Sequence, residues 1–199
     1  KRVLIGNNYY PAMADDKVTL VTEAIERVVA DGVQTRDGQT YPADVLIYGT
    51  GFAATEFLSP MQITGLHGQD LNQTWQSGAE AYKGICISGF PNLFMLYGPN
   101  TNLGHNSIIY MLESQFRYIS QCLQTLKRRR LRYLNVRTEA QSSYNQRIQH
   151  AAKRTVWAQG CSSWYLTAEG KQTVNWPGFT FAYRNLTRKP RLSDYDCVR

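Results

Sequence analysis

The first forty residues alternate short apolar segments with turn-forming residues. Asp-Gly pairs occur at positions 31–32 and 37–38, and this dipeptide favours the tight turns that join neighbouring antiparallel strands. The pattern therefore predicts a meander of short strands. The predicted strands cover residues 1–6, 18–21, 24–30 and 33–35, with a loop over residues 7–16.

Two later segments are almost continuously apolar. Residues 44–48 (Asp-Val-Leu-Ile-Tyr) run into Gly49, Thr50 and Gly51, and residues 90–97 run into Gly98-Pro99. Strands that are apolar on both faces are typical of a parallel sheet covered by helices on each side. We therefore predict an α/β fold in which these two segments are buried strands.

Two helices are predicted in the second half of the chain. The segment from Ser107 to about Arg128 has apolar residues at helical spacing, which predicts a single buried stripe. A second helix is expected over residues 138–157, with Glu139 in its first turn. An irregular, aromatic tail follows from Ser163. The apolar stripe of the first helix comprises Ile108, Leu112, Phe116, Ile119, Leu123 and Leu126.

Composition narrows the class of protein. Hydrophobic residues make up 43% of the 199 residues and charged residues 19%, as in folded soluble proteins. The net charge of +7 suits a phosphate-rich cofactor, an anionic membrane surface or nucleic acid. The basic run 127–130 follows an amphipathic helix, where cations suit the helix dipole, and aromatic residues are not interleaved with it. A basic nucleic-acid-binding module is therefore the weaker alternative.

The cysteines and histidines do not indicate a metal site. Four cysteines are scattered without a Cys-x-x-Cys pair, which predicts free thiols in a reducing, cytoplasmic setting. No apolar run approaches the roughly 18 residues of a membrane span. The chain opens on Lys-Arg-Val-Leu-Ile without an initiator methionine, so we expect it to be a piece of a longer protein.

Two junctions have the features of a dinucleotide site. Small residues at 49–51, after a predicted buried strand and before Phe52, would let the backbone approach a ligand closely. Residues 98–107 join the other predicted strand to the start of the long helix. Free N–H groups and the positive dipole end there can hold a phosphate or a negatively charged ring, although the Asn and Ser residues could equally be helix caps.

Taken together, Asp-Val-Leu-Ile-Tyr-Gly-Thr-Gly-Phe and Gly-Phe-Pro-Asn-Leu-Phe-Met-Leu-Tyr-Gly-Pro-Asn-Thr-Asn-Leu-Gly-His-Asn-Ser resemble the end of the FAD domain in flavin-containing and Baeyer–Villiger monooxygenases. The match covers nearly the whole chain, with Gly49 in place of an alanine. The resemblance implies the C-terminal part of a flavoprotein with two dinucleotide-binding domains. It places Gly49, Thr50, Gly51 and Phe52 at the cofactor, and Asn102 and Leu103 at the pyrimidine edge of the flavin.

The resemblance extends to both ends of the chain. Lys1-Arg2 is similar to the Lys-Arg pair of Baeyer–Villiger enzymes, which implies that Lys1 meets the 2′-phosphate of NADP. Arg2 would be catalytic, as a permanent cation beside flavin and nicotinamide. Trp164 matches a Ser-Trp-Tyr stretch whose tryptophan contacts NADP. Solvated charges at the chain end, and a core aromatic at Trp164, are the structural alternatives.

The implied function is an NADPH- and FAD-dependent monooxygenase that inserts one oxygen atom of O2 into an organic substrate through a peroxyflavin. Baeyer–Villiger oxidation of a ketone is favoured, and N- or S-oxygenation is the alternative. A related flavin-dependent reductase would usually carry a redox Cys-x-x-Cys, which is missing.

The resemblance also implies a division of the chain. Residues 1–42 would end the NADP-binding domain with a β meander, residues 43–130 would complete the FAD domain, and residues 131–199 would form a helical and aromatic C-terminal segment. Both Gly-x-Gly-x-x-Gly fingerprints would lie upstream, in the N-terminal half of the same enzyme. We therefore expect this chain alone to be inactive.

Overall fold

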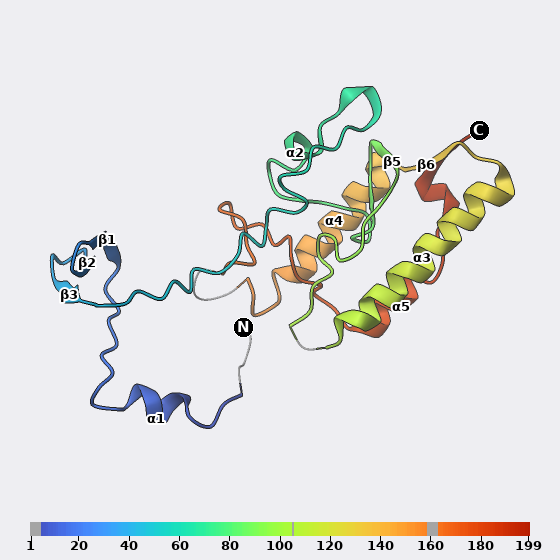
Figure 1. Ribbon diagram of the computed structural model, residues 1–199. Coiled ribbons are helices and arrows are strands. Elements are labelled where there is room, and N and C mark those ends of the chain that lie inside the picture. Colours follow the sequence, from blue (N-terminus) through green and yellow to red (C-terminus); the bar gives the residue numbers. More distant parts are fainter. Residues whose placement is uncertain (1–4, 105, 159–162) are drawn as a thin grey trace. The chain divides into compact units, whose positions relative to one another are not determined.

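The computed structural model describes residues 5–104, 106–158 and 163–199. The chain divides into two compact units, with the boundary between Phe52 and Ala53 (Figure 1). In the first unit, three short strands form an antiparallel meander in the order β1-β2-β3, which confirms the prediction from the Asp-Gly turns. The strands are β1 (Ile25–Val29), β2 (Gly32–Thr35) and β3 (Thr40–Pro42).

Three other predictions for the first unit are wrong. Residues 9–13 form the short helix α1 (Tyr9–Met13) where a loop was expected, and residues 18–21 are not a strand. Residues 44–48 are also irregular, and the side chain of Ile47 is 93% exposed. An apolar run becomes a buried strand only when neighbouring strands satisfy its backbone groups. No described strand pairs with this segment.

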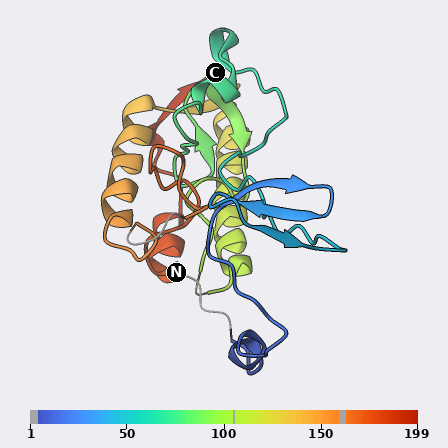
Figure 2. The same cartoon turned by 90° about the vertical axis from the view of Figure 1, so that its left-hand side faces the viewer.

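The second unit places its main core between short strands and three helices (Figure 2). β4 pairs antiparallel with β5, and β6 pairs antiparallel with β7. The side chain of Asn92 links the two ribbons, because its Nδ2 donates to the Arg132 carbonyl at 3.1 Å and its Oδ1 accepts from Leu134 N at 3.0 Å. The elements are η1 (Leu66–Gly68), α2 (Leu71–Thr74), β4 (Cys86–Ile87), β5 (Phe90–Phe94), α3 (Ile108–Arg129), β6 (Tyr133–Val136), α4 (Thr138–Ala152), α5 (Thr180–Leu186), η2 (Leu192–Asp194) and β7 (Tyr195–Val198).

The strand predicted at residues 90–97 is confirmed as β5, but it ends at Phe94 and its neighbour is antiparallel. Among the described residues, the one parallel pairing is an isolated bridge between Asn102 and Asn175. The prediction of two buried parallel strands is therefore wrong for this chain. The prediction that the chain mixes helices and strands is confirmed.

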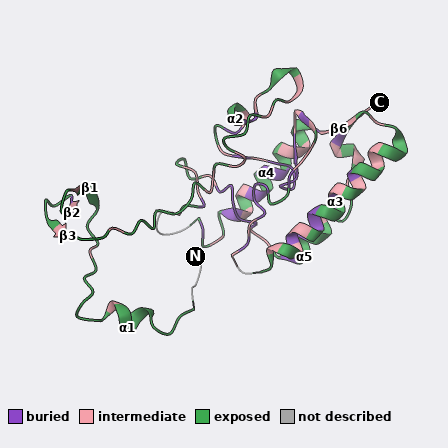
Figure 3. Cartoon of the chain, viewed as in Figure 1, coloured by how far each residue is buried: buried purple, intermediate pink, exposed green. Residues whose placement is uncertain are grey.

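Helix α3 has the predicted extent but a different buried face. It begins after Ser107 and ends where Arg130 adopts a left-handed conformation, with three cations in its last turn. Of the predicted stripe, Phe116 and Leu123 are about half exposed. Figure 3 shows which side of α3 is buried. The residues on that side include polar as well as apolar ones, so a stripe predicted from hydrophobicity alone is misplaced. They are Met111, Ser114, Gln115, Tyr118 and Cys122.

The buried polar groups of this face are paired. Tyr118 and Tyr195 share a hydrogen bond of 2.6 Å between their hydroxyls, and Gln115 Nε2 donates to Tyr183 Oη at 3.0 Å. Tyr183 Oη in turn donates to the Lys83 carbonyl at 2.7 Å. These bonds tie α3 to α5, to β7 and to the turn before β4, because each satisfies a group that would be costly to bury alone.

Helix α4 begins at Thr138 as predicted, with Glu139 in its first turn, but it ends at Ala152. The aromatic tail is more ordered than its sequence indicated. It contains α5 and β7, and β7 pairs with β6 over four residues. Within the described stretches of chain, no helix combines the length and the apolar character needed to cross a membrane.

Candidate functional site

The loop between β5 and α3 is held in place by the C-terminal tail. Asn100 is buried with a left-handed backbone (φ 58°), a conformation that asparagine tolerates better than most residues. Its backbone N–H donates to the Thr173 carbonyl at 2.7 Å. Its side-chain Nδ2 donates to the carbonyl and the Oε1 of Gln172 at 2.9 and 2.8 Å. The loop conformation therefore depends on residues more than seventy positions away.

Asn102 continues this pairing. Its N–H donates to the Val174 carbonyl at 3.0 Å, and its own carbonyl accepts from Trp176 N at 2.8 Å. Its side-chain Nδ2 donates to Asn175 Oδ1 at 2.7 Å, while its Oδ1 accepts from Tyr97 Oη at 2.6 Å. The amide of Asn102 is thus locked in one orientation and remains partly exposed.

Leu103 lies beside Asn102 but its side chain belongs to the main core, with 4% of its surface exposed. Its side chain therefore has little surface to offer a ligand. The backbone of residues 102–104 could face a ligand instead. Gly104 packs closely here, since a Cβ on it would lie 3.0 Å from the Trp157 ring.

The first turn of α3 completes the arrangement. The side chain of Ser107 makes no capping hydrogen bond, and the first turn of the helix contains no acidic residue. Asn106 Oδ1 accepts from Ser107 N at 2.7 Å, which satisfies one donor just before the helix begins. A 22-residue helix therefore presents its positive end without a compensating side chain from its own first turn.

These residues fit a planar ring rich in hydrogen-bond acceptors. The buried Nδ2 of Asn175, next to Asn102, has no hydrogen-bond partner among the described residues. Buried donors without partners are rare and costly, and they are found at ligand sites. The loop therefore combines an unpartnered buried donor with the uncapped start of α3.

Trp164 is 59% exposed, so the alternative that it is a core aromatic is wrong. Its ring stacks on that of Tyr165, with centroids 4.3 Å apart. Tyr165 is buried with Trp157 and Val174, and the Val174 carbonyl accepts from Asn102. Trp164 is therefore fixed to the same tail that holds the loop, with one face free for a planar ligand.

The remaining predicted site residues lie elsewhere. Gly49, Thr50, Gly51 and Phe52 are exposed at the end of the first unit, and Gly51 has a positive φ of 77°. A Cβ on Gly49 or Gly51 would meet no described atom within 4 Å, so the backbone here is open. Lys1 and Arg2 lie outside the described residues.

Sequence reasoning missed Asn100, Gln172 and Asn175, the buried polar residues that shape the loop. Each is at most 2% exposed. Residues 100–103 and 172–176 are rich in polar side chains. The two segments pair over a long distance in the sequence, which a local pattern does not reveal.

The loop at 98–107, the start of α3 and the exposed Trp164 together form a candidate cofactor site. No protein-family model matches the chain. Individual proteins of known class do match it. A Baeyer–Villiger monooxygenase of Pseudomonas aeruginosa is 45% identical over 98% of this chain, and the FAD-binding monooxygenase ktnD of Aspergillus niger is 41% identical over 98%.

Solved structures give the same result. Cyclohexanone monooxygenase from Rhodococcus sp. Phi1, bound to NADP+, superposes with a TM-score of 0.82 over 100% of this chain at 27% identity. The chain spans 37% and 33% of the two curated relatives and 39% of the Rhodococcus chain. It is homologous to one stretch of the Baeyer–Villiger monooxygenases, and the resemblance inferred from its sequence is confirmed.

Proposed function

We propose that this chain forms part of an NADPH- and FAD-dependent Baeyer–Villiger monooxygenase that converts a ketone into an ester or lactone. The observation that carries the proposal is the 45% identity to a Baeyer–Villiger monooxygenase across 98% of the chain. The FAD-binding relative from Aspergillus niger and the NADP+-bound cyclohexanone monooxygenase support the choice of cofactors. The flavin, when bound, supplies the activated oxygen.

The residues of this chain would position the cofactors. Asn102 and Leu103 would lie at the pyrimidine edge of the flavin, where the positive end of α3 would stabilise negative charge. The backbone of Gly49, Thr50, Gly51 and Phe52 would lie against the same cofactor, because small residues allow close approach.

Other residues would hold the nicotinamide coenzyme. Lys1 would pair with the 2′-phosphate and select NADPH over NADH, because a compact ammonium suits a phosphate. The exposed face of Trp164 would stack on the coenzyme. Arg2 would act as the catalytic cation beside the reacting groups, since its charge persists at any working pH. A cytoplasmic location is part of the same proposal.

Substrate profiling of the full-length enzyme tests the proposed reaction. Purified enzyme with FAD and NADPH would be given a cyclic ketone, a tertiary amine and a thioether in parallel. We expect NADPH consumption and product formation to match one to one with the ketone. Stoichiometric oxygenation of the amine or thioether, with no product from any of a panel of ketones, would overturn the Baeyer–Villiger assignment.

A further inference from the structure

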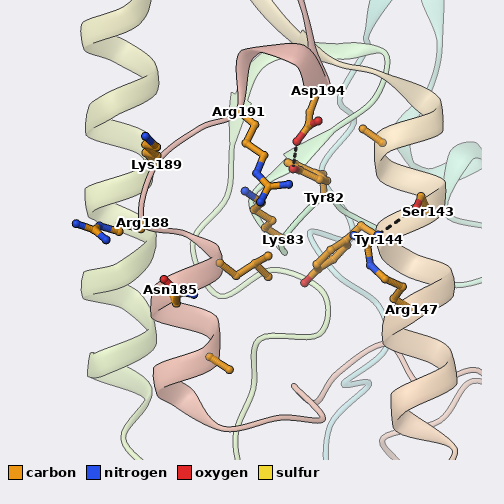
Figure 4. A pocket seen from close by; sticks show the side chains of 13 residues that line it. Tyr82, Lys83, Ser143, Tyr144, Arg147, Asn185, Arg188, Lys189, Arg191 and Asp194 are labelled. Atoms are coloured by element: carbon orange, nitrogen blue, oxygen red, sulfur yellow. Dashed lines mark hydrogen bonds between the residues drawn. The ribbon is translucent and has the colours of Figure 1, made fainter.

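A cationic cavity of about 560 Å³ lies in the second unit, away from the loop at 98–107 (Figure 4). It is bounded by the turn before β4, by α4 and α5, and by the segment leading into η2. Its lining contains five cationic side chains and one carboxylate. They are Lys83, Arg147, Arg188, Lys189 and Arg191, with Asp194.

Lys83 is the unusual member of this set, because it is 2% exposed. Its Nζ lies 4.9 Å from the ring centroid of Tyr82 and 4.7 Å from that of Tyr118. This Nζ makes no hydrogen bond or ion pair with any residue that the structure describes. The two rings offset part of the cost of burying the ammonium, but its three N–H donors lack an acceptor.

The charges around Lys83 compensate its ammonium only in part. Burial lowers the pKa of Lys83 to about 8; Asp194 opposes that shift and Arg191 adds to it. Asp194 is itself engaged, since its Oδ2 accepts from Tyr82 Oη at 2.5 Å. Figure 4 shows the Arg191 guanidinium beside the Lys83 side chain, whereas Arg188 and Lys189 point away from the middle of the cavity.

A second polar group in the wall is also unsatisfied. The buried hydroxyl of Tyr144 has no partner among the described residues, although those of Tyr118 and Tyr183 are hydrogen-bonded. Arg147, one turn further along α4, reaches no carboxylate and only bonds Ser143 Oγ at 3.2 Å. The cavity thus collects donors and positive charge from three separate segments: the turn before β4, α4 and the segment leading into η2.

We propose that this cavity binds the phosphate group of a small phosphorylated molecule, held by Lys83 and Arg191 with Arg147 at the rim. A phosphate dianion supplies both the counter-charge and the acceptors that these residues lack, and arginine forks match its geometry. The cavity lies within the 300–1,000 Å³ range of small-molecule sites, which favours an organic phosphate over the bare ion. Leu186, which is partly exposed, offers apolar surface for the rest of the molecule.

The test is a calorimetric titration of the purified protein with inorganic phosphate and with glycerol 1-phosphate, at pH 7 and constant ionic strength. We expect the ester to bind more tightly. Lys83→Met and Arg191→Gln should each weaken binding at least tenfold. Arg191 is exposed, so its variant keeps the test valid even if Lys83→Met fails to fold. Arg129→Gln, a matched loss of charge at the exposed end of α3, should bind within twofold of the parent.

Three results would overturn the proposal. The first is that the parent protein binds neither inorganic phosphate nor glycerol 1-phosphate. Alternatively, Arg129→Gln could weaken binding as much as Arg191→Gln, which would show general charge attraction. Equal affinity for phosphate and its ester would overturn the assignment to a phosphorylated organic molecule and leave the free ion as the ligand.

Discussion

At the scale of single residues, Arg2 is the residue on which the proposed chemistry most depends. A fixed cation beside a developing anion contributes about 3 kcal/mol, or roughly a hundredfold in rate. Arg2→Ala in the full-length enzyme should therefore retain FAD but lose about a hundredfold in ester formation, with the consumed oxygen recovered as hydrogen peroxide. Arg36→Ala, at an exposed turn of the meander, is the matched control. A normal ester yield from Arg2→Ala would show that Arg2 is not catalytic.

Lys1 should determine the choice of coenzyme. If its ammonium pairs with the 2′-phosphate, Lys1→Ala will raise the KM for NADPH at least tenfold and leave the KM for NADH nearly unchanged. Steady-state kinetics with both coenzymes measure this, with Lys17→Ala as an exposed control. An equal rise for both coenzymes would contradict a role in reading the phosphate.

Two buried thiols predict how stability responds to alkali. Burial raises the pKa of Cys86 and of Cys122 to about 12, from a reference value of 9.0. Because the unfolded chain loses these protons first, the free energy of unfolding should decrease as pH rises from about 9 towards 12. Lys83 has the opposite effect: because its pKa is lowered in the folded protein, it raises the free energy of unfolding as pH rises from about 8 to 10.5.

The same burial predicts selective alkylation. With iodoacetamide at pH 8, Cys197, which is exposed, should react fast, whereas Cys86 and Cys122 should react only in denaturant. Peptide mass spectrometry gives the extent at each site. Rapid labelling of Cys122 in the folded protein would contradict the core described above.

At the scale of elements, the loop at 98–107 and the tail at 172–176 behave as one structure. Asn100→Ala removes the side-chain hydrogen bonds to Gln172 and puts alanine in a left-handed conformation, so unfolding in urea should show a loss of about 2–4 kcal/mol. Asn100→Gly relieves the backbone strain and should lose less. Equal losses for the two variants would mean that the φ of 58° is not a constraint.

The sequence predicts an element well when the interactions that determine it lie between residues close in the chain. The meander follows from Asp-Gly turns, and α3 and α4 begin where their sequences indicate. The buried face of α3 was displaced because Gln115 and Tyr118 are buried through hydrogen bonds to distant residues. Residues 44–48 have a strand's composition but no described partner strand.

The residues of the candidate site also fall into those that the sequence predicted and those that only the structure reveals. The family resemblance implied a site role for Asn102, and the structure places it in a fixed, partly exposed loop. Its side-chain partner in the tail is Asn175, and the neighbouring Asn100 pairs with Gln172. Sequence patterns do not reveal these pairs, because the partners are more than seventy residues apart. The cofactor roles of Gly49, Phe52 and Trp164 remain predictions.

At the scale of the whole molecule, the chain spans well under half of the monooxygenases that it matches. It contains the loop and helix proposed to cover the flavin ring, but no Gly-x-Gly-x-x-Gly phosphate loop. We therefore expect the 199-residue chain to purify without colour and to bind added FAD weakly. Absorbance near 450 nm during gel filtration with FAD measures this, and stoichiometric yellow protein would contradict it.

The most direct test of the central claim is isotope incorporation by the full-length enzyme. The enzyme would turn over cyclohexanone with NADPH and FAD under 18O2, and mass spectrometry would follow the product. We predict a lactone that contains one 18O atom, with a yield equal to the NADPH consumed. Ketone recovered unchanged while NADPH is oxidised, with no ester from any ketone tested, would contradict it.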